Sequence, residues 1–409
     1  MLHQGQNRLE IWLADGWFRS QMMWAEAPIL NCWGDRIAAI AAIVAGGMVT
    51  LASDAHWRSG LLPVLKSGIS YGEDYDARVS PAETHGVAEI PFDLTLLAPH
   101  ETAPVRELPP IAPIDQWTDA EGRQIWDFGQ NAGATLRFQD AGVLGTDRAF
   151  DNRNYRSARA EIVYTLQGGT ETCAPIFTFY GFRYARLTVA GQAQVTDIAM
   201  IPISSVPTLA DGFTCGVPAV NRLVQNTIWS QRSNLIEVPT DGPQRDERLG
   251  WTGDAQVFAG TACWLADCES FLAKYLRDVM HDQHADGAVP HFSPDPTRLH
   301  PMPGRGDWAG ATGWGDAITV IPWQLYLQYG DATVLKDCFP AMLKWLDYLW
   351  NISKGPIVRP PATLRGKGIY LWRLAATRWR QPQAAPDRRR RLRRHPLPLH
   401  LDRPCRRAV

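Results

Sequence analysis

Carboxylate, guanidinium and aromatic side chains are concentrated in one short stretch of this chain, residues 241–254, which reads DGPQRDERLGWTGD. Pro243, Gly250 and Gly253 disfavour a continuous helix, so the sequence predicts a loop over most of this stretch. A helix is expected to begin near Gly253, because the run AQVFAGTACWLADC has apolar residues at helical spacing. From residue types alone, the stretch fits either a catalytic loop or a cluster of structural ion pairs.

One chemistry that such a stretch could perform is general acid catalysis, in which a carboxylic acid donates a proton to a leaving group. An acid that works at neutral pH needs a raised pKa, which a neighbouring carboxylate or apolar burial provides. Glu247 is the natural candidate, since Asp246 is adjacent and Trp251 and Asp254 are close in sequence.

The elements that must position this stretch begin with a β region over residues 1–103. Leu9, Ile11 and Leu13 alternate with other residues and predict a strand. The run IAAIAAIVAGGMVTLASDAHW is expected to form a hairpin with its glycines at the bend. Together these patterns predict a first domain made of strands.

Two further regions follow. The proline-rich stretch HETAPVRELPPIAP, residues 100–113, is expected to be a linker, and residues 114–207 predict a second β region with aromatic strands. Residues 208–361 predict successive apolar helices joined by loops, which is typical of an α/α barrel. The last of these helices is expected to present one apolar face, made of Leu335, Phe339, Met342, Leu343, Leu346 and Trp350.

Several phrases of the sequence resemble bacterial α-L-rhamnosidases, inverting glycoside hydrolases with an (α/α)6 barrel. These phrases are GQNRLEIWLADGWF, YGEDYDAR, WDFGQN, NYRSARA, FTFYGFRY and, most specifically, DGPQRDERLGWTGD. The resemblance covers about residues 5–360. It implies two β-sandwich (jelly-roll-like) modules, the first incomplete, and then an incomplete (α/α)6 barrel. The implied activity is release of terminal α-L-rhamnose from rhamnosides or rhamnose-containing oligosaccharides, without an organic cofactor.

Carried onto the matching positions, the resemblance makes Glu247 the general acid. It implies that Asp241, Arg245 and Asp254 hold the rhamnose hydroxyls, which offer donors and acceptors to carboxylate and guanidinium groups. Trp251 would form a wall of the subsite. Structural alternatives are a capping role for Asp241 and an ion pair within the loop for Arg245.

Other residues leave two interpretations open. Trp308 and Trp314 fit either aromatic subsite walls or core packing, and Arg248 fits an ion pair within the loop. Asp246 fits a structural role better than a catalytic one. No metal site is expected, because the HDQH run lacks a convincing third ligand. The histidines considered for such a site are His281, His284, His291 and His300.

Composition argues against several other classes of protein. The chain has 45% hydrophobic and 20% charged residues, as in ordinary globular proteins, and its 17 Trp suit both carbohydrate stacking and core packing. The body of the chain is acidic, so no nucleic-acid partner is expected. Seven scattered cysteines without a CxxC pair argue against a zinc site and a disulfide framework. We expect no membrane span and no signal peptide, and therefore a cytoplasmic location.

The C-terminal tail, residues 362–409, differs from the rest of the chain, with 14 Lys and Arg against 2 Asp. We interpret it as a disordered product of a shifted reading frame; a basic nucleic-acid-binding tail and a solvated linker are alternatives. No Glu follows Glu269, so the general base that the family carries later in its barrel has no counterpart here, and impaired hydrolysis is expected. A non-catalytic rhamnoside-binding or inactive remnant and another (α/α)6 glycosidase remain alternative functions.

Overall fold

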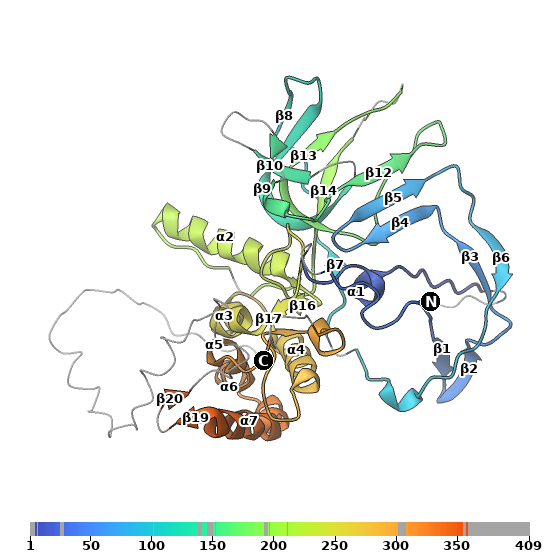
Figure 1. Ribbon diagram of the computed structural model, residues 1–409. Coiled ribbons are helices and arrows are strands. Elements are labelled where there is room, and N and C mark those ends of the chain that lie inside the picture. The colour runs from blue at the N-terminus through green and yellow to red at the C-terminus, as the bar shows by residue number, and fades with distance from the viewer. Residues whose placement is uncertain are drawn as a thin grey trace. The chain divides into compact units, whose positions relative to one another are not determined.

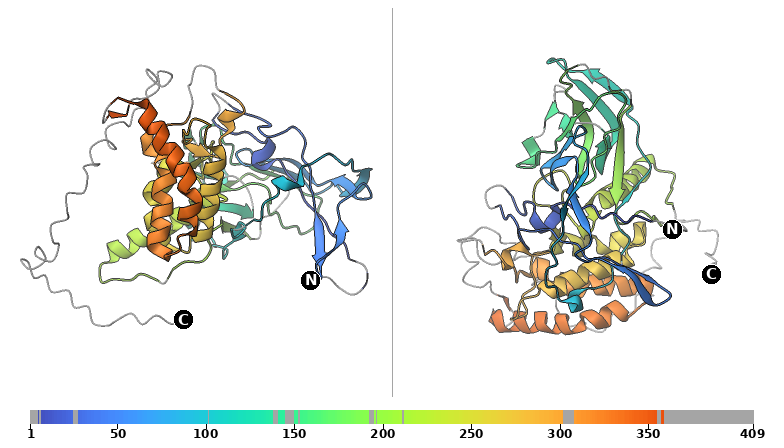
Figure 2. Two further views of the ribbon diagram at one scale, coloured as in Figure 1. Left: turned by 90° about the horizontal axis from the view of Figure 1, so that it is seen from below. Right: turned by 90° about the vertical axis from the view of Figure 1, so that its right-hand side faces the viewer.

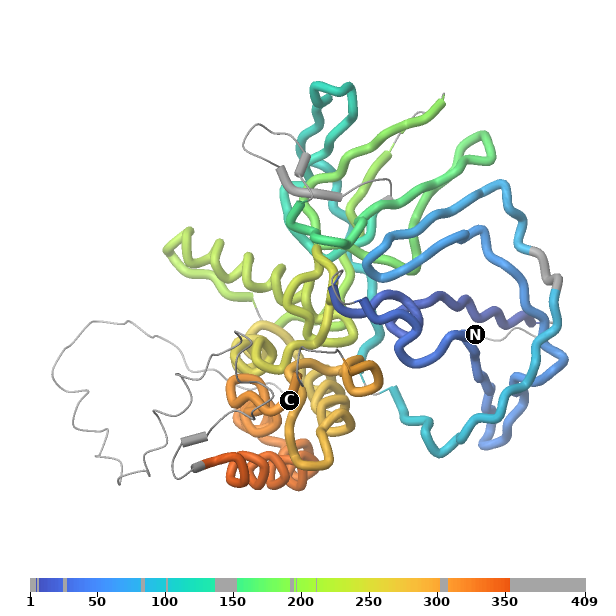
Figure 3. Tube along the Cα trace, viewed as in Figure 1, coloured from blue at the N-terminus to red at the C-terminus, as the bar shows by residue number. Residues whose placement is uncertain are grey.

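Small β-sheets come first along the chain and helices follow in the computed structural model (Figure 1). The structure describes residues 5, 7–24, 28–100, 102–137, 141–144, 150–151, 153–191, 195, 197–210, 212–301, 308–354 and 357–358. Residues Met1–Ile369 form one compact unit. The tail over residues 362–409, interpreted above as frameshifted, lies outside the described residues. The described part of the chain is a multidomain β + α protein (Figure 3).

The first β region forms short strands rather than one continuous sheet. Its elements are α1 Gly16–Arg19, β1 Ala42–Ala45, β2 Met48–Ala52, β3 Arg58–Leu61, β4 Val64–Gly68, β5 Gly72–Asp76, β6 Ala82–Gly86 and η1 Leu94–Leu96. β1 pairs with β2, β3 with β6, and β4 with β5. The predicted hairpin is confirmed: Gly46 and Gly47 join β1 to β2 with φ of +57° and +79°, a conformation that glycine adopts without strain.

The predicted strand at Leu9, Ile11 and Leu13 is wrong. These residues have no regular secondary structure, and their side chains are exposed. Alternation predicts a strand only where a neighbouring strand accepts its main-chain hydrogen bonds, and no described strand pairs with this segment.

The second β region is built on one seven-stranded sheet. Its elements are β7 Arg106–Glu107, β8 Asp115–Thr118, β9 Gln124–Arg137, β10 Ala141–Leu144, β11 Phe150–Asp151, η2 Arg153–Tyr155, β12 Ile162–Thr165, β13 Tyr180–Leu187 and β14 Ala199–Ser204. The strand order is β11-β10-β13-β9-β14-β7, and β8 pairs with β9. Phe128, Phe182 and Met200 are in the buried core of this region.

The linker predicted over residues 100–113 is wrong for its middle part. β7 lies within it and pairs with β14, and the main-chain N–H of Leu108 donates to the carbonyl of Pro202 at 2.7 Å. Leu108 is buried. The prolines of residues 100–113 are compatible with this position because β7 is the edge strand of the sheet. On the open side of an edge strand, no main-chain N–H has to donate to a neighbouring strand.

The first and second β regions share a three-stranded sheet, β12-β5-β4, in which β12 runs parallel to β5. Gly72 begins β5 with φ of +96°, and a Cβ there would lie 1.8 Å from the carbonyl oxygen of Glu161. That carbonyl accepts the N–H of Glu73 and the hydroxyl of Tyr180. The two regions are therefore joined through main-chain contacts that leave no room for a side chain at residue 72.

The last described region is helical. Its elements are α2 Pro218–Asn234, β15 Leu235–Ile236, β16 Val238–Pro239, β17 Gly250–Trp251, α3 Thr252–Leu265, α4 Glu269–Asp282, β18 Phe292–Ser293, η3 Pro296–Arg298, α5 Thr312–Gly315, α6 Ala317–Tyr329, α7 Thr333–Ile352, β19 Ser353–Lys354 and β20 Ile357–Val358. α3 and α4 both pack on α6, which packs on α7, while α2 packs on β9 and β14. The yellow and orange helices lie side by side in Figure 2. The expected helix near residue 253 is confirmed as α3.

The apolar face predicted for α7 is mostly not the buried one. Of its residues, Met342 is buried, whereas Phe339, Leu346 and Trp350 are exposed, Trp350 by 79%. The face that packs on the helical core contains Ala341, Met342, Trp345 and Tyr348. α7 therefore has two apolar faces, and periodicity alone could not decide which of them faces the core of this chain.

Substitution of Gly72 should destabilise the contact between the two β regions. We expect Gly72→Ala to lower the free energy of unfolding by about 2–4 kcal/mol, because alanine is strained at this φ and its Cβ would collide with main-chain oxygen. Gly86→Ala is the matched control, since no atom lies within 4 Å of a Cβ there, and it should cost less than about 1 kcal/mol. Urea titration measures both variants; equal midpoints would contradict the prediction.

Candidate active site

The chemically dense stretch forms a loop that closes between two short strands. β16 ends at Pro239 and β17 begins at Gly250, and Thr240 pairs with Gly250 across the base of the loop. The predicted loop conformation is confirmed, since residues 241–249 form no helix and α3 begins at Thr252. Inside the loop, Glu247 and Arg248 have φ of +91° and +45°. Such left-handed conformations cost about 1–3 kcal/mol each for residues other than glycine and are typical of functional sites.

Glu247 is buried in this loop, with 6% of its surface exposed, and among the loop's carboxylates Asp246 is more enclosed still. The indole N–H of Trp251 donates to its Oε1 at 2.8 Å, and Nη2 of Arg156 donates to its Oε2 at 3.4 Å. Burial, and then the proximity of Asp241, raise the pKa of Glu247 to about 7, while Trp251 and Arg245 act in the opposite direction. The acid candidate is thus poised to exchange a proton near neutral pH.

The other charged candidates of the stretch lie around this carboxyl. Arg245 Nη2 donates to Asp241 Oδ2 at 2.5 Å and lies 3.8 Å from Oε1 of Glu247. Asp254 lies in the first turn of α3. Its side chain is exposed at the surface of the chain; partial loss of hydration, and then the negative charge of Asp241, raise its pKa. The structure therefore brings Asp241, Arg245, Glu247 and Asp254 into one electrostatic cluster.

Aromatic side chains form one side of this cluster. Trp251 lies 5.1 Å from Phe292 and 6.2 Å from Trp308 between ring centroids. Trp308 in turn lies 5.4 Å from Trp24 of the N-terminal segment. Trp314 lies against Gly253, where a Cβ would be 3.0 Å from its ring. Trp308 and Trp314 are thus both near the loop. Trp308 is also buried in a core cluster with Leu249 and Phe292, so both interpretations of it stay open.

His291 was considered only as a metal ligand, but it lies among these aromatic rings. Its ring centroid is 6.1 Å from that of Trp308 and 5.2 Å from that of Trp314. Burial lowers the pKa of His291 to about 4, so the imidazole is neutral at neutral pH. No group of three potential metal ligands is found within the described ranges. No pattern in the sequence pointed to this placement, because it depends on the pairing of β17 with β18.

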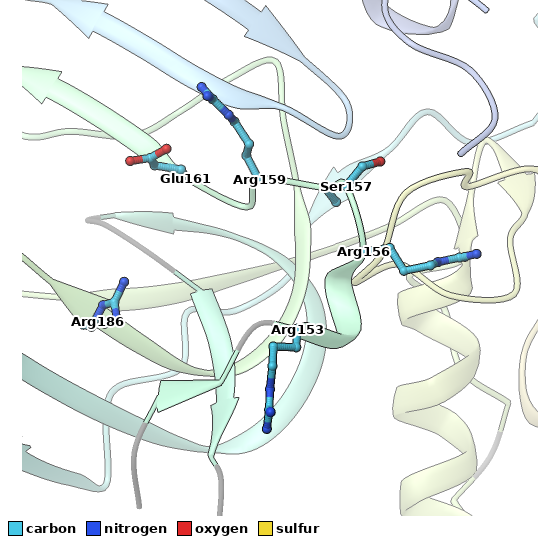
Figure 4. Close-up of a pocket in the computed structure, with 7 residues that line it drawn as sticks. Arg153, Arg156, Ser157, Arg159, Glu161 and Arg186 are labelled. Carbon is cyan, nitrogen blue, oxygen red and sulfur yellow. The ribbon is translucent and has the colours of Figure 1, made fainter. Parts of the chain in front are cut away.

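Sequence reasoning also missed a contact from the second β region. The turn at Arg156 and Ser157 reaches the loop and contacts Asp246, which is buried. Beside this turn is a polar pocket of about 380 Å³. The pocket is lined by Arg153, Arg156, Ser157, Ala158, Arg159, Glu161 and Arg186. In Figure 4 the side chain of Arg156 extends toward the loop, whereas Arg159 and Arg186 extend elsewhere. The stretch NYRSARA contains Arg156 and Ser157, but nothing in its sequence indicated that they contact Asp246.

Arg248 does not form the ion pair considered for it. Its guanidinium is fully buried, and Nη1 donates to the carbonyls of Ile69 and Phe179. Its Nε donates to the carbonyl of Arg245 at 3.3 Å. The side chain therefore connects the loop to main-chain atoms of both β regions.

Three family profiles match successive parts of the chain. The N-terminal domain of α-L-rhamnosidases matches residues 1–110, the bacterial α-L-rhamnosidase concanavalin-like domain matches residues 118–204, and the six-hairpin glycosidase domain of the same family matches residues 210–366. Within the described residues, no helix has the length and apolar character needed to cross a membrane.

Similar proteins carry the same family name. An α-L-rhamnosidase of Streptomyces avermitilis is 34% identical over 389 residues, which cover 87% of this chain and 36% of that protein. One from Formosa agariphila is 30% identical, covering 87% of this chain and 40% of its own length. The chain thus spans little more than a third of the length of these relatives.

Solved structures of α-L-rhamnosidases also superpose on this chain. The crystal structure of the Streptomyces avermitilis α-L-rhamnosidase complexed with L-rhamnose superposes with a TM-score of 0.74 at 33% identity, covering 85% of this chain and 36% of that one. The α-L-rhamnosidase of Aspergillus terreus gives a TM-score of 0.72 at 29% identity, covering 82% and 41%.

The raised pKa of Glu247 should make stability depend on pH. Between pH 4.5 and about 7 the folded state keeps a proton that the unfolded chain releases, so this group's stabilisation is complete below pH 4.5 and is lost as pH rises to 7. The slope attributable to the group approaches about 1.4 kcal/mol per pH unit. Denaturant titrations from pH 4.5 to 8 should show a smaller slope for Glu247→Gln than for the unsubstituted chain. Identical slopes would contradict the shift.

Proposed function

Because this chain belongs to the bacterial α-L-rhamnosidases, a family of glycoside hydrolases, we propose that residues 241–254 supply the acid half of a site for terminal α-L-rhamnose. The observation that carries this proposal is the environment of Glu247, buried beside an indole N–H with its pKa raised to about 7. A carboxyl with this pKa is protonated in about half of the molecules at neutral pH. It can then donate its proton to the glycosidic oxygen as the bond breaks.

In this proposal, the charged residues around Glu247 bind the sugar hydroxyls. Asp241 Oδ1 and Arg245 Nε are buried and have no hydrogen-bond partner in the part of the chain that the structure describes. A hydroxyl both donates and accepts hydrogen bonds, so adjacent hydroxyls of one sugar ring complement a carboxylate and a guanidinium. Asp254 would add a third contact from the first turn of α3. The L-rhamnose in the Streptomyces avermitilis complex supports this choice of ligand.

The aromatic residues would bind the apolar parts of the ligand. Rhamnose is a 6-deoxy sugar, so it carries a methyl group in addition to its C–H faces. Trp251, Trp308 and Trp314 provide flat apolar surfaces beside the charged cluster. We therefore expect small rhamnosides or rhamnose-containing oligosaccharides as ligands.

The finer mechanism and architecture are also part of the proposal. We infer inversion, with a second carboxylate activating water opposite Glu247, and helices α2–α7 as part of an (α/α)6 barrel. The exposed apolar side chains of Leu223 on α2 and of Phe339 and Trp350 on α7 suit packing against further helices. Since no Glu follows Glu269 in these 409 residues, the chain by itself should bind rhamnose and hydrolyse rhamnosides slowly.

Substitutions in the loop should separate binding from proton transfer. Glu247→Gln should bind L-rhamnose within about threefold of the unsubstituted chain and lose at least about 10²-fold in any hydrolysis of an aryl α-L-rhamnoside. Arg245→Gln should weaken binding by about tenfold or more, because it removes a charged hydrogen-bond donor. Lys336→Gln, an exposed charge on α7, is the control and should change neither. Calorimetry measures binding, and release of the aryl group measures turnover.

Each outcome has a distinct meaning. Absence of rhamnose binding would contradict the proposed ligand, and full turnover by Glu247→Gln would contradict the acid assignment. Binding without turnover in the unsubstituted chain would restrict its function to rhamnoside binding. Turnover of another aryl glycoside in place of the rhamnoside would indicate a glycosidase with a different sugar preference.

A further inference from the structure

The turn Tyr155–Ser157 of the second β region holds the loop directly beside the candidate acid. The carbonyl of Tyr155 accepts the main-chain N–H of Asp246 at 3.4 Å. The main-chain N–H of Ser157 donates to Asp246 Oδ2 at 3.3 Å, and its hydroxyl donates to the same oxygen. Arg156 Nε lies 2.9 Å from Asp246 Oδ1, and its Nη2 lies 3.4 Å from Glu247 Oε2. One guanidinium therefore spans two adjacent carboxylates.

We propose that Arg156 is a positioning residue of the active site, which orients the carboxyl of Glu247 from the second β region and sets the strength of this acid. The inference rests on the proposed role of Glu247. It adds to the site a residue of the second β region, outside the loop of residues 241–254. Arg156 is suited to the task because a guanidinium can donate through Nε and Nη2 in one plane.

The backbone of this turn supports a specific role for the side chain. Arg156 has φ of +58°, a conformation that costs a residue other than glycine about 1–2 kcal/mol. Tyr155, which precedes it, is fully buried, and its hydroxyl donates to the carbonyl of Gly181 at 3.2 Å. The buried Tyr155 fixes the turn, and the left-handed conformation of Arg156 directs the Arg156 side chain toward the loop.

Charged groups face the Glu247 carboxyl from the loop, from α3 and from the second β region, and Arg156 is one of them. Asp241 and Arg245 face the carboxyl from the loop, Asp254 lies nearby on α3, and Arg156 faces it from the second β region. A cation within 4 Å favours the ionised carboxyl. The Arg156 side chain is 42% exposed, so water screens this effect and keeps it small. When Glu247 releases its proton, Arg156 and the Trp251 N–H would stabilise the resulting carboxylate.

The experiment is a titration of the Glu247 carboxyl by ¹³C NMR in the full chain, with the signal assigned by its loss in Glu247→Gln. We expect Arg156→Gln to raise the pKa of Glu247 by about 0.5–1 pH unit. Arg156→Lys keeps the positive charge and should shift it by less than half as much. If Arg156→Gln does not fold, Arg156→Met, which keeps an apolar stem, replaces it.

Arg159→Gln is the matched control. Arg159 lines the same pocket three residues later but extends away from the loop in Figure 4, so its removal should leave the pKa of Glu247 unchanged. A purely structural role for Arg156 would lower the stability of Arg156→Gln without moving this pKa, and that result would overturn the inference. L-rhamnose binding by the unsubstituted chain is measured in parallel. Its absence would contradict the proposed function while leaving the titration result valid.

Discussion

The buried guanidinium of Arg248 is the contact on which the geometry of this site depends. A cation without access to water is costly unless polar atoms surround it, and here carbonyl oxygens of Ile69 and Phe179 accept its hydrogen bonds. The guanidinium also lies 4.5 Å from the centre of the Phe179 ring. Burial lowers the pKa of Arg248 to about 10, so it remains charged at neutral pH. These carbonyls come from both β regions, so the loop holds its position only when both regions are folded around it.

This dependence explains how two successive left-handed residues persist in the loop. Glu247 and Arg248 would relax toward ordinary backbone conformations if only the loop held them. Arg248 is fixed by its buried contacts, and the main chain of Glu247 pairs with Met23 of the N-terminal segment. The strained backbone directs the Glu247 carboxyl toward Trp251 and Arg156 rather than into solvent. The β regions are thus part of the machinery that positions the proposed acid.

The sequence was informative where function depends on a contiguous stretch. Residues 241–254 predicted the loop, the start of α3 and a cluster of candidate residues that the structure brings together, although their roles stay predictions. It was uninformative where distant segments meet. Arg156 reaches Asp246 across the chain, and His291 is placed by strand pairing, so neither contact has a local pattern. Hydrophobic periodicity also failed for α7, because both of its faces are apolar and only tertiary packing selects Trp345 over Trp350.

The strength of the proposed acid follows from opposing effects on its protonated and ionised forms. Burial and Asp241 favour the protonated form of Glu247, and if they acted alone the carboxyl would hold its proton too tightly to protonate a leaving oxygen efficiently. Trp251 and Arg245 favour the ionised form, and Arg156 adds a screened positive charge from the second β region. A pKa near 7 therefore reflects both the charges of the loop and the burial of Glu247 by the surrounding fold. A change in how the second β region contacts Asp246 would alter acid strength without altering any residue of the signature stretch.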